Sequence, residues 1–128
     1  MESLIIEEQY NLPKVNFNPI TGLLILKGRS IPENPTKFYQ PLENWVNEFI
    51  LTQPASINFD IHVDYLNTHS TECLLILLKY LRKYDVENNA DVKVVWKYDE
   101  FDEDMQELGE DLASIINISF EIIEVKED

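Results

Sequence analysis

A short polar segment in the middle of the chain carries the residues best suited to chemistry. Residues 67–71, sequence NTHST, are here called the polar junction. They follow an alternating apolar and polar run from Ile57 to Val63 and precede an apolar-rich segment with helical spacing, which predicts a strand, a junction and a helix. The first backbone N–H groups of a helix lack partners within the helix, and that end favours negative charge. A hydroxyl there can cap the helix or carry a phosphate.

The residue types alone leave both roles of the junction open. As an N-cap, Thr68 or Ser70 would contribute about 1 kcal/mol to the stability of the helix. As a phosphate acceptor, the same hydroxyl would add nearly two negative charges to a surface that a partner reads. Asn67, His69 and Ser70 would be the neighbours of a phosphate on Thr68.

A run of acidic residues gives a second candidate site. The stretch from Asp99 to Asp111 contains eight acids and no base. Its spacing does not fit a calcium loop, because counting from Asp99 puts Phe101 at the third ligand position, and counting from Asp102 puts Glu107 at the turn glycine. The run is therefore expected to be the solvated or partner-facing start of a helix, where negative charge is favoured.

Histidine and cysteine residues form a third candidate. His69 and Cys73 are four residues apart and could share a helix face, but two ligands do not complete a zinc site, and His62 lies on the expected strand. A catalytic Cys73 would need an electropositive setting and a base, and His69 offers only the base. The glycines stand apart, so there is no phosphate-binding loop. The sequence thus predicts no catalytic residue, metal or cofactor, and a protein that is not an enzyme.

The charge balance limits the partners. The chain has 128 residues, with 24 acids against 10 bases and a net charge of −14. Nucleic acid and anionic membranes would be repelled, whereas basic protein surfaces or cations would be attracted, unless the charge serves solubility alone. A single cysteine, Cys73, and the lack of a leader or membrane span predict a cytoplasmic location.

The elements around the junction predict an α/β fold. The length favours one domain over residues 1–128. The expected order is β-β-α-β-α-β-α-β, which predicts a mixed sheet that is mostly parallel beyond an N-terminal hairpin. Residues 4–6 are expected to be a short strand or a disordered lead. The other expected elements are a hairpin over 15–17 and 23–26 ended by Gly28, a helix from Thr36 or Pro41 to before Pro54, a strand 57–63 ending at Asp64, a helix to Tyr84, a loop over 86–91, a strand 92–99, a helix 102–116, and a strand 120–123 before an acidic tail.

Two apolar patterns predict how the helices pack. The segment Cys73–Leu78 is apolar nearly all round, so part of it must meet another helix or a partner protein. The apolar stripe of the last helix is expected to contain Met105, Leu108, Leu112 and Ile115.

Three blocks of sequence resemble one known family. They read SIPENPTKFYQPLENWVNEFI, YLNTHSTECLLILL and VVWKYDEFDEDMQELGEDLA, and the likeness runs from about Tyr10 to Phe120. In order and spacing they resemble the SiaC family of bacterial regulatory phosphoproteins, which resembles in turn the anti-sigma-factor antagonist, or STAS, fold. The resemblance therefore implies a single STAS-like regulatory domain.

The resemblance also implies a partner-switching role. In that family a cognate serine/threonine protein kinase phosphorylates the threonine of an LNT motif, here Thr68, and a PP2C-type phosphatase removes the phosphate. The phosphorylation state decides binding to a downstream target, in the best-known branch a diguanylate cyclase that the unphosphorylated form promotes. Many relatives carry serine after the threonine, whereas here His69 stands there and Ser70 follows, so Thr68 and Ser70 are both candidate acceptors. The residues expected to bind partners are Pro32, Glu33, Asn34 and Leu66.

Two other classes of function stay open at this point. One is a protein-interaction module without phosphorylation, in which the polar junction only caps a helix. The other is a small enzyme that uses His69 and Cys73 or the acidic run, for which no complete catalytic set is visible.

Overall fold

The computed structural model describes residues 1–126, so the last two residues of the expected acidic tail lie outside the described part. Residues 1–126 form six strands and three helices, and the strands make one sheet. The elements are β1 (Leu4–Ile6), β2 (Lys14–Phe17), β3 (Leu23–Ser30), α1 (Pro35–Leu51), β4 (Ser56–Leu66), α2 (Thr68–Asn88), β5 (Asp91–Asp99), α3 (Glu103–Ile116) and β6 (Ser119–Val125).

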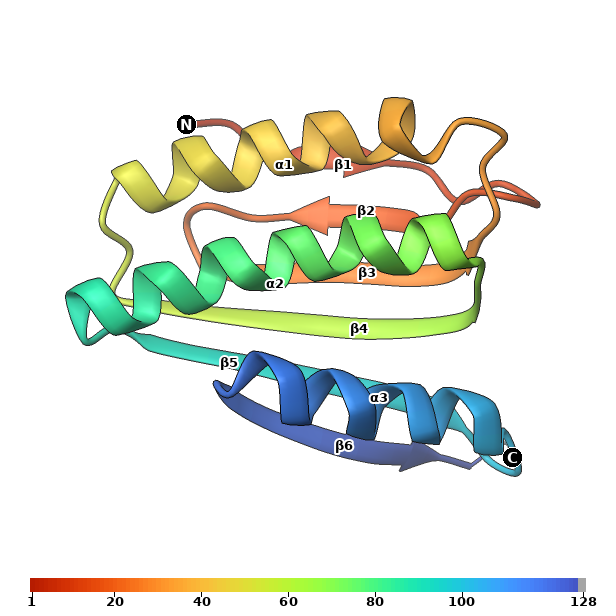
Figure 1. The fold of residues 1–128 in the computed structure, drawn as a ribbon. Helices are drawn as coiled ribbons and strands as arrows, with labels where there is room; N and C mark the ends of the chain where they lie inside the picture. The colour runs from red at the N-terminus through yellow and green to blue at the C-terminus, as the bar shows by residue number, and fades with distance from the viewer. Residues whose placement is uncertain (127–128) are drawn as a thin grey trace.

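The sheet is mixed, as the sequence predicted. Its strands lie in the order of the chain, from β1 at one edge to β6 at the other. The pairs β1–β2 and β2–β3 are antiparallel, and the pairs from β3 to β6 are parallel (Figure 1). The order of elements contains one strand more than expected, because residues 4–6 form β1 and pair with Val15–Phe17.

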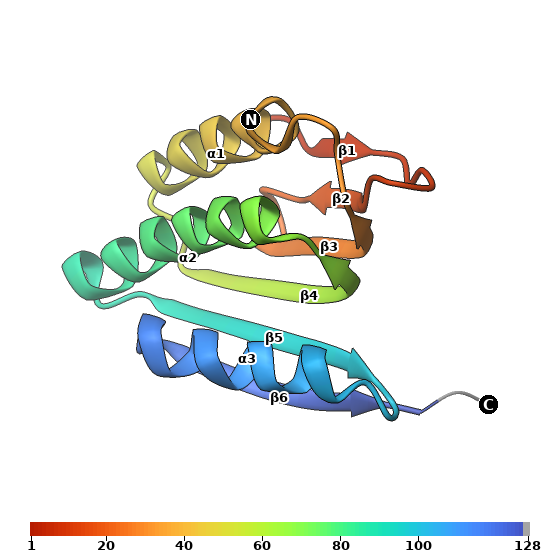
Figure 2. The same ribbon diagram turned by 45° about the vertical axis from the view of Figure 1, so that its right-hand side comes forward.

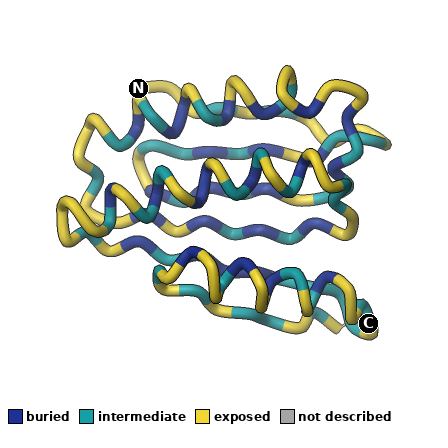
Figure 3. Tube along the Cα trace, in the orientation of Figure 1, coloured by how far each residue is buried: buried dark blue, intermediate teal, exposed yellow. Residues whose placement is uncertain are grey.

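All three helices cover the same face of the sheet, and α2 lies between α1 and α3 (Figure 2). Alternate residues of β4, including Phe59 and Ile61, point to this helical layer and are fully buried. Figure 3 shows the buried positions gathered between the helices and the strands. The fold is thus a two-layer α/β structure with its core on one side of the sheet.

The apolar surplus of α2 is absorbed mainly by its neighbours. Leu74, Leu77 and Leu78 are fully buried, and Leu75 packs partly buried against the core. Ile76 keeps 40 % of its surface exposed. Because α2 also contacts α1 and α3, neighbouring helices cover part of this surplus, whereas Ile76 stays at the surface.

Several expected boundaries were wrong, and those of β3 and β4 were wrong because pairing between the two strands extends them. Gly28 does not end β3, which continues to Ser30 through a bulge, and β4 continues past Asp64 to Leu66 opposite Ser30. Likewise α2 runs on to Asn88, so most of the expected loop over 86–91 is helix or strand. The helix α1 begins at Pro35 and continues through Pro41.

The expected stripe of α3 needs one correction. Ile115 is 60 % exposed, and Ile116 is buried in its place. The buried face also includes Gly109, where a side chain would collide with the Trp96 indole. Trp96 fills the space above the glycine and donates a hydrogen bond from its indole N–H to the Met105 carbonyl, at 2.9 Å.

No helix within residues 1–126 combines the length and the apolar character needed to cross a membrane.

Candidate functional site

The connections from strand to helix meet at one edge of the molecule. The parallel strands β3, β4 and β5 end there, and α1, α2 and α3 begin there (Figure 1). In sheets of this kind, the carboxyl ends of parallel strands are where binding residues gather. The polar junction and the loop before α1 both lie at this edge.

The polar junction is the N-cap and first turn of α2. Asn67 is the N-cap, and its side-chain oxygen accepts a hydrogen bond from the Ser70 backbone N–H at 2.8 Å. Thr68 is the first helical residue, and both Thr68 and His69 are exposed. The sequence had suggested Thr68 or Ser70 as the N-cap, but the N-cap is Asn67. Thr68 is exposed and does not cap the helix.

Ser70 points the other way, into the core. Its side chain is fully buried, as is that of Ser30 at the end of β3. Ser30 Oγ donates to Ser70 Oγ at 3.1 Å and lies 2.7 Å from the hydroxyl of Tyr39 on α1. These three hydroxyls, here called the hydroxyl chain, join α1, β3 and the first turn of α2.

The direction of the hydroxyl chain follows from its chemistry. Ser30 has one hydroxyl proton and donates it to Ser70, so Tyr39 must donate to Ser30. Burial away from water raises the pKa of Tyr39 to about 12, and the hydrogen bond to Ser30 offsets only part of that rise. The phenol therefore stays protonated, and remains a donor, throughout the neutral pH range.

The loop before α1 places most of the expected partner-binding residues together. Pro32, Glu33 and Asn34 line an open cavity of about 400 Å³. Pro32 is buried there, whereas Glu33 and Asn34 are exposed, and Asn34 also caps α1. Leu66 is not among the residues that line this cavity, because it is held half-buried in β4 opposite Ser30.

His69 and Cys73 line a small cavity between α1 and α2. Its volume is about 140 Å³, and Thr36 Oγ1 lies 3.5 Å from His69 Nε2. Burial, with the nearby Glu43 and Glu72 carboxylates, raises the pKa of Cys73, so the thiol is less ready to act as a nucleophile than a free one. Across residues 1–126, His, Cys, Asp and Glu side chains do not gather in groups of three that could hold a metal.

His62 and the acidic run are engaged in local contacts. His62 lies on the sheet face opposite the helices, and its Nε2 is 2.8 Å from Asp99 Oδ1. Asp102 caps α3 by accepting from the Met105 N–H at 3.1 Å. His62 and His69 are therefore on different faces of the sheet, and the acidic run begins α3 as its spacing indicated.

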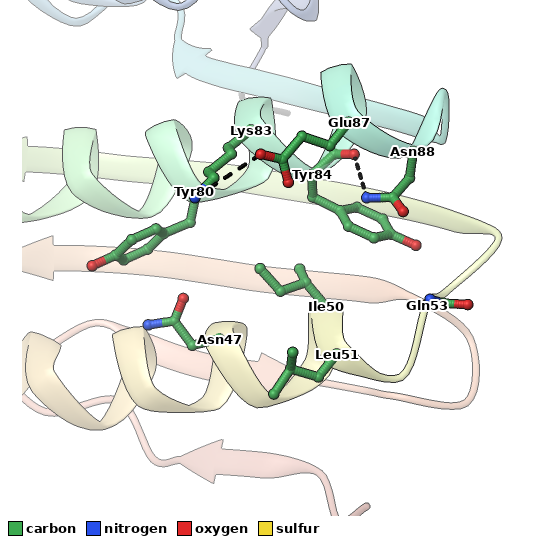
Figure 4. A pocket seen from close by; sticks show the side chains of 9 residues that line it. All are labelled: Asn47, Ile50, Leu51, Gln53, Tyr80, Lys83, Tyr84, Glu87 and Asn88. Carbon is green, nitrogen blue, oxygen red and sulfur yellow. Dashed lines mark hydrogen bonds and ion pairs between the residues drawn. The ribbon is translucent and has the colours of Figure 1, made fainter.

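A second groove lies at the far ends of α1 and α2. Its volume is about 360 Å³, and Figure 4 shows the side chains that line it, among them Tyr80, Tyr84 and Glu87. The tyrosine hydroxyls are already paired, since Tyr80 donates to Glu43 at 2.8 Å and Tyr84 to the Pro54 carbonyl at 2.6 Å. The tyrosine hydroxyls of this groove are therefore less available to a partner than the exposed Thr68 hydroxyl at the start of α2.

Sequence reasoning missed Ser30 and Tyr39. Ser30 is 9 residues from Tyr39 and 40 from Ser70, so no local pattern joins the three. The available signal was weak, a serine after a strand and a tyrosine on an otherwise apolar helix face.

Comparison with known proteins identifies one family. The family model described as SiaC family regulatory phosphoprotein matches residues 6–125. A curated relative, an uncharacterized protein of Pseudomonas aeruginosa strain UCBPP-PA14, is 26 % identical over 122 residues, which cover 95 % of this chain and 96 % of the relative.

Solved structures of SiaC from Pseudomonas aeruginosa share the fold. Apo-SiaC superposes with a TM-score of 0.87 at 23 % identity, and the match covers 96 % of this chain and 99 % of that one. The complex of the diguanylate cyclase SiaD with its activator SiaC gives a TM-score of 0.90 at 25 % identity, and the match covers 95 % of this chain and 99 % of the matched chain.

Proposed function

Because this chain belongs to the SiaC family of regulatory phosphoproteins, we propose that it is a non-catalytic partner-switching protein controlled by phosphorylation of Thr68. A cognate serine/threonine kinase adds the phosphate, and a PP2C-type phosphatase removes it. Residues 1–128 act as a single regulatory domain. The phosphorylation state decides whether the chain binds a downstream signalling protein.

The observation that carries the proposal is the contrast between two nearby hydroxyls. Thr68 is exposed at the start of α2, whereas Ser70 is fully buried and hydrogen-bonded to Ser30. A kinase needs a hydroxyl that it can reach, so the contrast favours Thr68 over Ser70 as the acceptor. Asn67, His69 and Ser70 are then the neighbours of the phosphate.

A phosphate at this position would be tolerated by the protein that carries it. It would sit at the N-terminus of a helix of 21 residues, where the helix dipole favours negative charge. The change would therefore act mainly on partners, by like-charge repulsion and desolvation or by recruiting a basic pocket.

The downstream partner is proposed to be a diguanylate cyclase or a similar signalling protein. SiaC of Pseudomonas aeruginosa is the activator of the diguanylate cyclase SiaD in a solved complex. The partner would dock on the surface around Thr68, which includes Pro32, Glu33 and Asn34, with Leu66 close by in β4. In its unphosphorylated form the chain would bind and promote this partner.

Substitution of the acceptor tests the proposal. The purified chain is incubated with ATP and an extract of the native host, and phosphate is located by mass spectrometry. Thr68→Ala is expected to lose the label completely while keeping the wild-type circular dichroism spectrum. Thr21→Ala, which removes an exposed threonine of the β2–β3 turn, is the matched control and should be labelled like the wild type. Full labelling of Thr68→Ala would show that Thr68 is the wrong residue. An unlabelled wild type would instead favour an interaction module without phosphorylation.

A further inference from the structure

The hydroxyl chain is a buried polar connection between the first turn of α2, which carries the proposed acceptor Thr68, and the rest of the core. Ser30 and Ser70 are fully buried and Tyr39 is 2 % exposed, so none of these hydroxyls can exchange its partner for bulk water. A buried hydroxyl that loses its partner keeps the full desolvation penalty. The three hydrogen-bonded hydroxyls therefore stabilise one another, and removal of one of them leaves another without its partner.

The hydroxyl chain ends on the residue that also closes the cap of α2. Ser70 gives its backbone N–H to Asn67 Oδ1 at 2.8 Å and receives the Ser30 hydroxyl on its side chain at 3.1 Å. The Asn67 N–H donates to the Ser30 carbonyl at 3.4 Å. Thr68 lies between Asn67 and Ser70. Ser30 therefore holds the chain one residue before Thr68 and two residues after it.

The other end of the hydroxyl chain lies on α1, next to the expected docking loop. Tyr39 stands one helical turn after Pro35, where that loop passes into the helix. A second contact joins the same two helix starts, since Thr36 Oγ1 is 3.5 Å from His69 Nε2. The start of α1 and the start of α2 are thus tied together through side chains and not only through the sheet.

From this arrangement we propose that Tyr39 and Ser30 are positioning residues for Thr68, which hold the first turn of α2 in the one geometry that the kinase recognises. The inference rests on the proposed function. The kinase would read Thr68 as part of an ordered helix start and not as a flexible peptide. Loosening of the hydroxyl chain then slows phosphorylation although Thr68 itself is unchanged.

The variant that tests this is Tyr39→Phe, which removes the hydroxyl and keeps the ring. Tyr84→Phe is the matched control, because Tyr84 is also buried, at 5 % exposure, and its hydroxyl donates to the Pro54 carbonyl at the opposite end of α2. Both variants lose one tyrosine hydrogen bond, so they are expected to lose similar amounts of global stability. They differ in which end of α2 they loosen.

Two readouts separate positioning from general destabilisation. In hydrogen exchange, the backbone amides of Ser70 and Thr71 are expected to exchange about threefold to tenfold faster in Tyr39→Phe, as loss of one buried hydrogen bond predicts, and unchanged in Tyr84→Phe. The initial rate of Thr68 phosphorylation by native-host extract and ATP should fall at least about twofold in Tyr39→Phe only. Ser30→Ala should act like Tyr39→Phe, and the double variant should show less than the sum of the two effects.

The outcomes distinguish this inference from the proposed function. No phosphate on Thr68 of the wild type would refute the proposed function and, with it, the role of Tyr39. A labelled wild type with equal or faster labelling of Tyr39→Phe would refute the positioning role alone. Equal slowing by Tyr84→Phe, or unchanged exchange at Ser70 and Thr71 in Tyr39→Phe, would overturn it in the same way.

Discussion

At its first turn, α2 is held by Tyr39 of α1 through two serine hydroxyls, whereas near its last turn α2 uses its own Tyr84 to reach the Pro54 carbonyl. The first arrangement joins three separate elements beside an exposed threonine. The second fastens a helix end to a neighbouring loop, next to a groove whose tyrosines are already paired. Both ends of α2 are therefore anchored by a tyrosine hydroxyl, but only the anchor at the first turn lies beside an exposed hydroxyl, that of Thr68.

The two caps of α2 also differ. Asn67 closes the first turn with a side-chain hydrogen bond to Ser70, while Asn89 ends the helix in the left-handed conformation, at φ 48°. The first cap holds the backbone on both sides of Thr68, the residue that we propose to be modified. The second only turns the chain toward β5.

The largest expected effect comes from the turn between β2 and β3, at the end of the sheet opposite Thr68, and it should change stability alone. Gly22 has φ +75°, and a side chain there would collide with the Ser56 carbonyl. Gly22→Ala is therefore expected to lower the free energy of unfolding by about 2 to 4 kcal/mol, measured by urea denaturation. The exposed neighbour Ile20→Ala is the control and should change it by less than about 0.5 kcal/mol. If Gly22→Ala slowed Thr68 phosphorylation of the folded protein, the β2–β3 turn and the first turn of α2 would not be independent.

A smaller change in the free energy of unfolding is expected when the pH is raised far enough to ionise Tyr39. The pKa of Tyr39 is raised to about 12 in the folded state, so its contribution to stability is complete below its unfolded value near 10 and is lost as the pH rises toward 12. Urea denaturation at pH 9 and pH 12 should therefore show a fall in the free energy of unfolding of which about 2 kcal/mol disappears in Tyr39→Phe. Burial also raises the pKa of Tyr84, so Tyr84→Phe should remove a smaller part of the fall. An identical pH dependence in the wild type and Tyr39→Phe would contradict the buried, protonated phenol.

The smallest expected changes in stability come from substitutions at the two caps of α2, Asn67 and Asn89. Asn67→Ala should lower the free energy of unfolding by about 1 kcal/mol, because it removes the side-chain acceptor of the Ser70 N–H. Asn89→Gly should raise it by about 0.5 kcal/mol, because glycine adopts the left-handed conformation without strain. Both values come from thermal or urea denaturation. A loss of stability in both variants would mean that Asn89 makes a contact beyond its backbone conformation.

The order and type of most elements could be predicted because they follow local patterns. The alternation from Ile57 to Val63 predicted β4, and the spacing of apolar residues predicted all three helices. The ends of β3 and β4 could not be predicted, since Asp64 sits as the extra residue of a bulge that breaks the alternation while pairing continues to Leu66. The stripe of α3 shifted by one residue because Gly109 carries no apolar side chain, although it packs closely on Trp96.

The candidate site could be predicted only as far as it is local. The polar junction was recognisable as a helix start, and the structure places Thr68 there. The separation of Thr68 from Ser70 depends on Ser30 and Tyr39, which reach Ser70 from other elements and leave no periodic signal. Burial of one hydroxyl and exposure of the other is a tertiary property, so the sequence alone left both as candidates.

Intact mass with site mapping, on the protein taken from its native host under two growth conditions, decides whether Thr68 is phosphorylated. We expect a fraction of the molecules to carry one phosphate, located on Thr68, and we expect that fraction to differ between the conditions. Phosphate on another residue, or none in either condition, would contradict a phosphorylation switch at Thr68.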